Sequence, residues 1–347
     1  MNSFGNNFRV TVFGESHGPV VGCVIDGVPV GIELSEGDFA ADIARRAAGA
    51  EGTTPRREPD TPRFLSGVFN GHTTGSPLTI VFDNTNTRSE DYAQFAATPR
   101  PGHADFVAAV KFDGANDPRG GGHFAGRLTL PIVAAGVVAK KMLGMEISPL
   151  ATLGQDDSKN VISSEVEKSQ SCIKASIVAM GGSADKAEWP SLLEAAKREG
   201  DSLGAIIECS IEGLPIGLGE PFWDSVESMI SHAVFAIPGV RGVEFGDGFK
   251  AAAMKGSEHN DPFGPDGPVK NGAGGVNGGI TNGAPVVFRV AFKPTSSVAR
   301  AQKTWNYETE SEETLEIKGR HDVCFALRCP VIVEAMASIV LADLLYR

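Results

Sequence analysis

The sequence predicts a single interwoven domain in which helices and strands are mixed along the chain. A length of 347 residues allows about two domains or one large mixed unit, and no stretch resembles an interdomain linker. Residues 128–143 and 330–345 are Ala-rich and apolar nearly all round, as expected of helices buried in a core. The 42 glycines follow no repeat period, which indicates many tight turns or close approaches of the backbone to a ligand.

The predicted strands follow from period-2 alternation and from β-branched residues. Residues 8–13 and 20–25 form the first pair and flank a Gly-rich turn, Gly14-Glu15-Ser16-His17-Gly18. Further strands are predicted, in chain order, at residues 78–82, 145–153, 176–180, 203–211 and 286–292.

The predicted helices begin with a capping-box pattern at residues 35–38, which starts a helix that runs through Arg46. Pro131 falls in the first turn of the helix at 128–143, where proline is tolerated. Other helices are predicted at residues 104–112, 183–198 and 221–235. Residues 256–283 are rich in Gly, Asn, Asp and Pro without an apolar period, which predicts a long loop that is functional or mobile.

The formal net charge of −12 disfavours nucleic acid and membrane surfaces as partners, because binding to either needs a basic protein surface. The N-terminal residues contain no basic region followed by an apolar one, so no signal peptide is predicted. Five scattered cysteines without a CxxC pair are typical of a reducing compartment, and we expect a cytoplasmic protein.

Standard cofactor and metal motifs are absent from the sequence. The chain has no Gly-Lys pair of a Walker A loop and no HExxH, and no metal site is predicted. Residues 272–277 come closest to a dinucleotide fingerprint, but they lack its third glycine and follow no strand. A dinucleotide-binding fold is therefore disfavoured.

Four of the seven histidines lie beside Gly, Arg or acidic residues: His17, His103, His123 and His321. An isolated histidine is more often a core residue, whereas a Gly-rich turn lies at the surface and exposes the ring. Imidazole titrates near neutral pH, so these side chains are candidate acid–base groups.

Arginines cluster in a chain that is acidic overall. The candidates are Arg45, Arg46, Arg56, Arg57, Arg100, Arg119, Arg127 and Arg320. Guanidinium groups bind phosphate and carboxylate, although for Arg45 and Arg56 a role as solvated surface charge is equally favoured. Residues 120–122, three glycines before a predicted helix, and the turn at 293–297 offer backbone N–H groups or hydroxyls to an anion.

Ten motifs, taken in order, give the chain a resemblance to the chorismate synthase family over essentially its whole length. They are FRVTVFGESHG (8–18), TTPRREPD (53–60), LSGVFNGHTTGSP (65–77), RPGHAD (100–105), RGGG (119–122), GDSLGA (200–205), GVEFGDGF (242–249), AGG with GGI (273–280), KPTSS (293–297) and GRHD (319–322). The resemblance implies an α+β fold, a β-α-β sandwich of antiparallel sheets enclosing long helices. It further implies one domain over residues 1–347 and a homotetramer.

The resemblance also implies a carbon–oxygen lyase of the shikimate pathway, which leads to the aromatic amino acids. Members of the family convert 5-enolpyruvylshikimate 3-phosphate to chorismate and phosphate by an anti-1,4-elimination. The reaction has no net redox change but needs reduced FMN, an electron-rich flavin that can supply charge as phosphate leaves. Nothing in the sequence indicates a nicotinamide site, so we expect dependence on externally reduced FMN.

The resemblance assigns three catalytic roles. It implies that His17 is the acid at the departing phosphate, His103 the group beside the flavin ring, and Asp322 the carboxylate that assists proton removal through flavin N5. The substrate-binding residues it implies are Ser16, Arg46, Arg100, Arg127 and Arg320. The FMN-binding residues it implies are His123, Phe124, Ala125, Gly278, Gly279, Lys293, Pro294, Thr295, Ser296, Ser297 and Arg320.

The chain departs from the commonest family pattern in three places. Residues 123–128 read HFAGRL where most members carry Arg-Ser-Ser-Ala-Arg-Glu, so the hydroxyls expected near the flavin are missing. Residues 47–52 lack a second substrate arginine, for which Arg56 or Arg57 could substitute, and Pro238-Gly239 replaces an Asn-Ala pair. These departures bear on affinity for FMN and substrate more than on reaction type.

Two other hypotheses stay open: a flavin- or phosphate-binding protein without catalysis, and a different phosphate lyase. The retained His17, His103 and Asp322 disfavour the first. Turnover of the enolpyruvyl substrate, and the range of substrates accepted, would separate the three.

Overall fold

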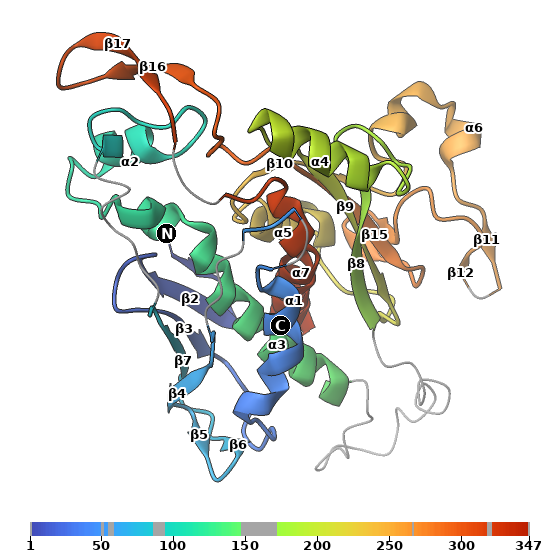
Figure 1. The fold of residues 1–347 in the computed structure, drawn as a ribbon. Helices are drawn as coiled ribbons and strands as arrows, with labels where there is room; N and C mark the ends of the chain where they lie inside the picture. The colour runs from blue at the N-terminus through green and yellow to red at the C-terminus, as the bar shows by residue number, and fades with distance from the viewer. Residues whose placement is uncertain are drawn as a thin grey trace.

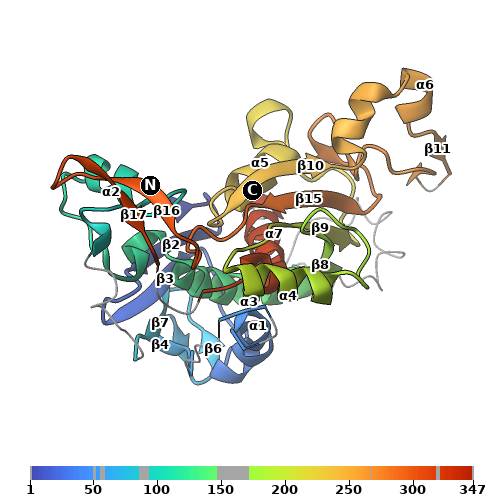
Figure 2. The same ribbon diagram turned by 45° about the horizontal axis from the view of Figure 1, so that its top comes forward.

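Two antiparallel sheets lie on opposite sides of a layer of helices in the computed structural model of the chain (Figure 1). The structure describes residues 2–49, 52–54, 59–85, 94–146, 172–265, 267–317 and 321–345. Turning the molecule shows the helices α3 and α7 between the strands of the two sheets (Figure 2). The expected β-α-β sandwich is confirmed.

The first sheet has the strand order β1-β2-β3-β7-β4, with every neighbouring pair antiparallel. Its strands are β1 (Ser3–Phe4), β2 (Arg9–Gly14), β3 (Val20–Asp26), β4 (Arg63–Ser66) and β7 (Leu78–Asp83). Strands β2 and β3 pair directly, with Gly14 opposite Val21, so the Gly-rich turn between them closes a hairpin at one end of the strands. The three strands predicted in this region are found.

The second sheet has the order β10-β15-β9-β8 and is also antiparallel. Its strands are β8 (Cys172–Met180), β9 (Ala205–Glu212), β10 (Val240–Phe245) and β15 (Val286–Phe292). Alternate residues of β15 are buried, which is the period-2 pattern that predicted it. The sequence did not predict β10, an edge strand that contains Gly242 and pairs with β15 through an irregular register.

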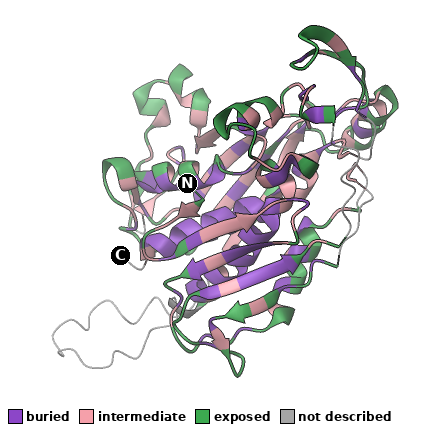
Figure 3. Cartoon of the chain, turned by 90° about the vertical axis from the view of Figure 1, so that its left-hand side faces the viewer, coloured by how far each residue is buried: buried purple, intermediate pink, exposed green. Residues whose placement is uncertain are grey.

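Helices α3 (Thr129–Glu146) and α7 (Pro330–Leu345) form the middle layer, where α3 contacts β2, β3 and β7 while α7 contacts β8 and β9. Every residue of α7 from 331 to 344 is buried, as Figure 3 shows for this layer. Apolar residues on all sides of both helices are thus explained by packing on all sides. None of the described helices has the length and apolarity needed to cross a membrane.

The remaining helices are α1 (Ala40–Arg46), α2 (Asp105–Lys111), α4 (Trp189–Glu199), α5 (Val226–Val234) and α6 (Gly256–His259). The capping box predicted before α1 is present, with Ser35 and Asp38 bonded to each other's backbone. Helix α4 begins six residues later than predicted, because the Ser183 hydroxyl accepts the N–H of Asp185 in a local turn that competes with helix.

Two predictions from the sequence, one of a strand and one of a loop, need correction. Residues 145–146 complete α3 rather than starting a strand, and residues 147–153 of that prediction lie outside the described residues. The long loop at 256–283 contains α6 and two small hairpins, β11 (Phe263–Gly264) with β12 (Gly267–Pro268) and β13 (Val276–Asn277) with β14 (Ile280–Thr281). Two further hairpins were not predicted: β5 (Val68–Phe69) with β6 (His72–Thr73), and β16 (Gln302–Asn306) with β17 (Ser311–Leu315).

We predict that Gly136 sets the spacing between α3 and α7. A Cβ atom added there would lie 2.4 Å from Cβ and 2.6 Å from Cα of Ala335 on α7. Gly136→Ala should therefore lower the free energy of unfolding by about 1–3 kcal/mol, the usual cost of overpacking.

Gly144 provides the control, because it lies on the same helix and an added Cβ would meet nothing within 4 Å. Gly144→Ala should leave stability unchanged or raise it by up to about 1 kcal/mol through helix propensity. Urea unfolding of both variants measures the difference, and equal effects would contradict the assigned contact.

Candidate active site

Two Gly-rich turns meet at the end of the first sheet. The N–H of Ser16, in the turn after β2, donates to the carbonyl of Gly122 over 3.0 Å. Gly120 has φ +62°, and a Cβ there would lie 2.5 Å from the His17 ring, so this position requires glycine. Ser16 and His17 are both buried. The Gly triplet thus leaves room for these two side chains rather than only lining a ligand.

His103 lies on the other side of the same triplet, where an added Cβ at Gly121 would come within 3.3 Å of the ring. Its Nδ1 is 2.5 Å from a carboxylate oxygen of Asp105, a residue of α2. Arg100 donates to both oxygens of Asp105, through Nε and Nη2 over 2.7 Å each, and to the Ser297 hydroxyl over 3.1 Å. This network fixes the orientation of His103.

The carboxyl of Asp105 has a perturbed pKa. Burial by itself would raise the pKa, but the hydrogen bonds and charges of Arg100 and His103 outweigh it and hold the pKa well below its usual range. Asp105 is therefore ionised at neutral pH and serves as the counterion of Arg100.

The turn at residues 293–297 packs directly against the RPGHAD motif. Lys293 Nζ donates to the carbonyl of Gly102 over 2.9 Å and also bonds the Ser296 hydroxyl, which itself donates to Gly102 over 2.8 Å. Burial, followed by the charge of Arg241, lowers the pKa of Lys293. Two motifs that are 190 residues apart in the sequence therefore form one wall beside His103.

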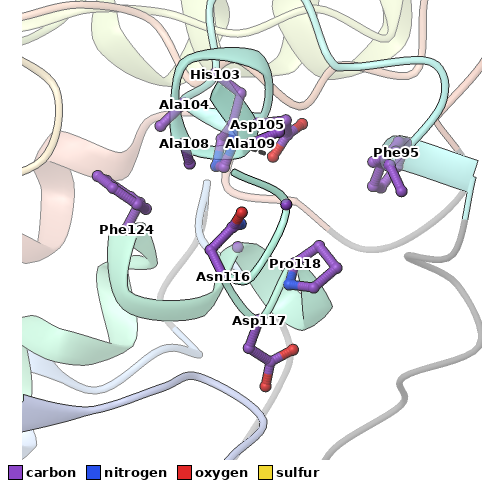
Figure 4. A pocket seen from close by; sticks show the side chains of 13 residues that line it. Phe95, His103, Ala104, Asp105, Ala108, Ala109, Asn116, Asp117, Pro118 and Phe124 are labelled. Atoms are coloured by element: carbon purple, nitrogen blue, oxygen red, sulfur yellow. Dashed lines mark ion pairs between the residues drawn. The ribbon is translucent and has the colours of Figure 1, made fainter. Parts of the chain in front are cut away.

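A pocket of about 160 Å³ opens between α2 and the Gly triplet. Figure 4 shows His103 and Ala104 on one side of it, with Phe124, Asn116 and Asp117 across the opening. Its lining combines apolar side chains with one imidazole and two carboxylates, which suits a planar, partly polar ligand.

Residues 123–125 lie at the pocket and offer few hydrogen-bond donors to a ligand. His123 Nδ1 lies 2.8 Å from the carbonyl of Gly14, Ala125 is buried, and the Phe124 ring is 37% exposed. The Phe124 ring centroid is 6.3 Å from that of Phe112, so this side chain forms an apolar wall where the family pattern has a hydroxyl.

Buried guanidinium groups gather behind the His17 turn. Arg46 is 3% exposed and donates to the Thr129 hydroxyl over 2.9 Å, with Asp60 3.5 Å away. Arg127 pairs with the other oxygen of Asp60 and donates to Asn84 Oδ1 over 2.9 Å. The carboxylate of Asp60 therefore binds both Arg46 and Arg127, two arginines to which the resemblance assigns substrate binding.

Asn84 connects this cluster to the histidine turn. Its amide group donates to the carbonyls of Glu15 and Gly18 over 3.1 and 2.8 Å, while its oxygen accepts from Arg127. The positions of His17 and Arg127 are thus coupled through a single side chain.

Asp322 is connected to the main chain of Arg46 through Arg328. Its Oδ1 accepts the N–H of Thr54 over 2.7 Å, and its Oδ2 accepts from Arg328 over 3.3 Å. Arg328 also donates from Nε to the carbonyl of Arg46 over 2.9 Å. The expected catalytic carboxylate is therefore held next to the arginine cluster.

Sequence reasoning missed several residues of this site, among them Asn84, Asp60, Asp105 and Arg328. The two aspartates close the quoted motifs TTPRREPD and RPGHAD, so their motif positions were a usable signal. Arg328 lies outside every quoted motif, and only its place just before the apolar helix marks it.

Two buried polar atoms in this region have no hydrogen-bond partner among the described residues: Thr295 Oγ1 and His321 Nε2. Burial, and then the charge of Arg100, lowers the pKa of His321, which keeps its imidazole neutral at pH 7. Unsatisfied buried polar atoms are costly, so their presence beside the pocket fits a polar ligand such as a flavin with its phosphate.

One part of the predicted FMN site, Gly278 with Gly279, lies away from this wall. Gly279 packs against Glu220 and Ser225 at the start of α5, whereas Gly239, which follows the end of α5, accepts the N–H of Lys293. Nine helical residues, about 13 Å of rise, separate the two ends. Arg320, like Arg56 and Arg57, lies outside the described residues.

Comparison with known proteins identifies the family. The family model described as chorismate synthase matches residues 8–346. The chain belongs to the chorismate synthase family. It is therefore a lyase.

Individual relatives support this assignment. A chorismate synthase of Chitinophaga pinensis is 55% identical over 345 residues, covering 99% of this chain and 96% of that protein. One from Korarchaeum cryptofilum is 43% identical, covering 99% and 97%. A crystal structure of chorismate synthase superimposes with a TM-score of 0.70 at 25% identity, covering 99% of this chain and 92% of the other.

We predict a pH-dependent contribution of Asp105 to stability. Its folded-state pKa is below the ordinary value of 3.8, so its contribution is complete above about pH 4 and is lost as pH falls through the folded pKa. Asp105→Asn leaves Arg100 without a buried counterion and should cost about 3 kcal/mol at pH 7.

Urea unfolding at pH 7 and at pH 3 measures this contribution. The stability difference between the original protein and Asp105→Asn should shrink at the lower pH. Asp26→Asn, at an exposed carboxylate that accepts the N–H of Gly27, should change stability little at either pH. A difference that stays constant with pH would contradict the assigned ion pairs.

Proposed function

We propose that the chain converts 5-enolpyruvylshikimate 3-phosphate to chorismate and phosphate, with reduced FMN as cofactor and no net redox change. The observation that supports this most strongly is the meeting of His17 and His103 across one Gly triplet, with buried arginines beside them. Such a site offers acid groups and cationic groups to a phosphorylated dicarboxylate.

His17 is proposed as the acid at the departing phosphate. It is buried next to Ser16, in a turn held by Asn84, so a proton on its ring would be directed at a bound oxygen rather than shared with water. Protonating the phosphate as the carbon–oxygen bond breaks lowers the charge that the leaving group must carry.

His103 and Asp322 are proposed for the other side of the reaction. Asp105 and Arg100 orient His103 toward the pocket, where it would stand beside the flavin ring. Asp322 is held through both oxygens and is proposed as the carboxylate that assists proton removal.

The arginines are proposed to bind the charged groups of the substrate. Arg46, Arg100 and Arg127 are each buried against a carboxylate, and their charges are therefore little screened by solvent. Ser16 would add a hydroxyl, and Arg320 is proposed to complete the set. We propose that substrate anions share or replace the resident carboxylates.

FMN is proposed to bind along the turn at residues 293–297 and the segment 123–125, with Arg320 as a further contact. When bound and reduced, the flavin supplies electron density to the allylic system. The unpartnered Thr295 hydroxyl and the cation of Lys293 support this placement. The Phe124 wall indicates that the ring is held here more by apolar contact than by hydroxyls.

We further propose a single domain that assembles as a homotetramer in the cytoplasm. One core cluster joins both sheets and the central helices, which supports a single domain. Phe222, Trp223 and Phe249 are each at least 84% exposed, and large apolar side chains of this kind are usually covered in an assembly. The small-molecule substrate needs neither nucleic acid nor membrane as a partner.

The decisive experiment is an anaerobic assay of the purified protein with the enolpyruvyl substrate and reduced FMN, with chorismate and phosphate as the measured products. A binding protein without catalysis would retain FMN but form neither product. A different phosphate lyase would release phosphate from other substrates and leave this one unchanged.

We predict that His17→Ala and His103→Ala each slow turnover by about 100-fold or more, a typical scale for lost acid–base groups. Both rings lie in Gly-flanked turns outside the apolar core, so the fold should survive. Steady-state turnover with circular dichroism as the folding check tests this, and near-normal turnover in both variants would refute the roles.

We also predict that Arg46→Ala, Arg100→Ala, Arg127→Ala and Arg320→Ala weaken substrate binding by about 10- to 150-fold each. The range corresponds to roughly 1.5–3 kcal/mol for a charge-assisted hydrogen bond. Calorimetric titration of substrate into the FMN-loaded protein measures the affinities.

The control for this series is Arg198→Ala. Arg198 is exposed in the last turn of α4 and should be neutral within about 0.5 kcal/mol for stability. If the four variants bind substrate as this control does, the substrate lies elsewhere.

A further inference from the structure

Arg328 stands out among the residues that the resemblance leaves without a role. It ends the short 3-10 helix Phe325–Arg328, directly before α7, and its side chain is only 14% exposed. We propose that Arg328 is a positioning residue of the elimination reaction, which joins the carboxylate of Asp322 to the arginines that receive the substrate. This inference rests on the proposed function.

The contacts of Arg328 connect two parts of the site. Its Nη1 donates to Asp322 Oδ2 over 3.3 Å, and its Nε donates to the main-chain carbonyl of Arg46 over 2.9 Å. Because the second oxygen of Asp322 is held by the N–H of Thr54, the carboxylate cannot rotate without losing one of two bonds. The planar guanidinium therefore fixes the distance between Asp322 and the end of α1.

The charges around Arg328 favour the binding of an anion. The bond from Arg328 to the main chain of Arg46 brings its guanidinium group into the cluster in which Arg46 and Arg127 share the carboxylate of Asp60. Burial, followed by the charge of Arg328, lowers the pKa of Arg46. Repulsion between the guanidinium groups of Arg46 and Arg328 does not stabilise a purely structural contact, whereas a bound anionic substrate would reduce it.

A purely structural role is the competing explanation, because the carbonyl that Arg328 caps belongs to the last residue of α1, where helix carbonyls lack internal partners. Removal of such a cap would lower stability without a specific effect on turnover. Kinetic constants, substrate affinity and stability therefore have to be measured on the same variants.

The experiment compares Arg328→Gln and Arg328→Lys by steady-state kinetics with reduced FMN, by calorimetric titration of substrate and by thermal unfolding. Arg328→Gln should lower kcat by about 10-fold or more and weaken substrate binding by about 10-fold, since it removes both the charge and the fork. Arg328→Lys should restore affinity to within about 3-fold through its charge, while kcat stays low because one ammonium cannot reproduce the fork.

The matched control is Arg289→Gln, on β15. Arg289 is also half-buried, and it also bonds carboxylates and a main-chain carbonyl: Glu208, Glu244 and Gly246. Its loss should lower stability and leave kcat and substrate affinity unchanged. If Arg328→Gln matches this control in kcat and affinity, the proposal is overturned.

A double variant tests whether Arg328 acts through Asp322. If it does, Arg328→Gln combined with Asp322→Asn should have about the same kcat as Asp322→Asn alone. Multiplying losses would overturn the proposal. If Arg328→Gln does not fold, Arg328→Lys decides: low kcat with near-normal affinity supports the proposal, and normal kcat overturns it. Absence of turnover in the unmodified protein would instead refute the proposed function.

Discussion

The close crossing of α3 and α7 determines where the rest of the molecule can lie. Gly136 allows the backbone of α3 to approach Ala335, and each helix carries one sheet on its outer face. Because both helices are apolar on every side, they are stable only while both sheets cover them. The spacing between the sheets therefore depends on the contact of α3 with α7, which is closest where Gly136 meets Ala335.

Helix α7 also anchors the parts of the site that converge on it. Near its end, Asp343 accepts the N–H groups of Asn6, Asn7 and Phe8 over 2.6, 2.6 and 3.0 Å and so holds the segment that leads into β2 and the His17 turn. Near its start, Glu334 binds both terminal nitrogens of Arg45, the residue before Arg46. Burial would raise the pKa of Glu334, but its hydrogen bonds lower it, so its interaction with Arg45 persists as an ion pair at neutral pH.

The sequence predicted the buried helices and the central strands well, because their signals are local. The pattern of β15 and the uniform apolarity of α7 are properties of short segments that packing reinforces. Strand β10 was missed because an edge strand with glycine depends on its neighbour for pairing. In the site, motifs located His17 and His103, but not the contact of either ring with the Gly triplet, because the glycines that they contact lie 103 residues after His17 and 18 residues after His103, and only folding brings them together. Arg328 could not be predicted at all, since only the folded chain places it against Asp322.

In an acidic protein, a site that binds an anion must be locally positive although the total charge of the chain is negative. The net charge of −12 repels anions at long range, but this repulsion is screened within about 8–10 Å at ordinary salt. Inside the site, Arg46, Arg100 and Arg127 are desolvated, and a buried guanidinium without a counterion would be costly. Asp60 and Asp105 meet that need in the folded chain before any ligand arrives. The resident carboxylates therefore stabilise the fold, and on the proposed function they also limit substrate affinity, because an incoming anion would compete with them for the same donors. On the proposed function, such competition also favours release of the product, which carries one phosphate fewer than the substrate.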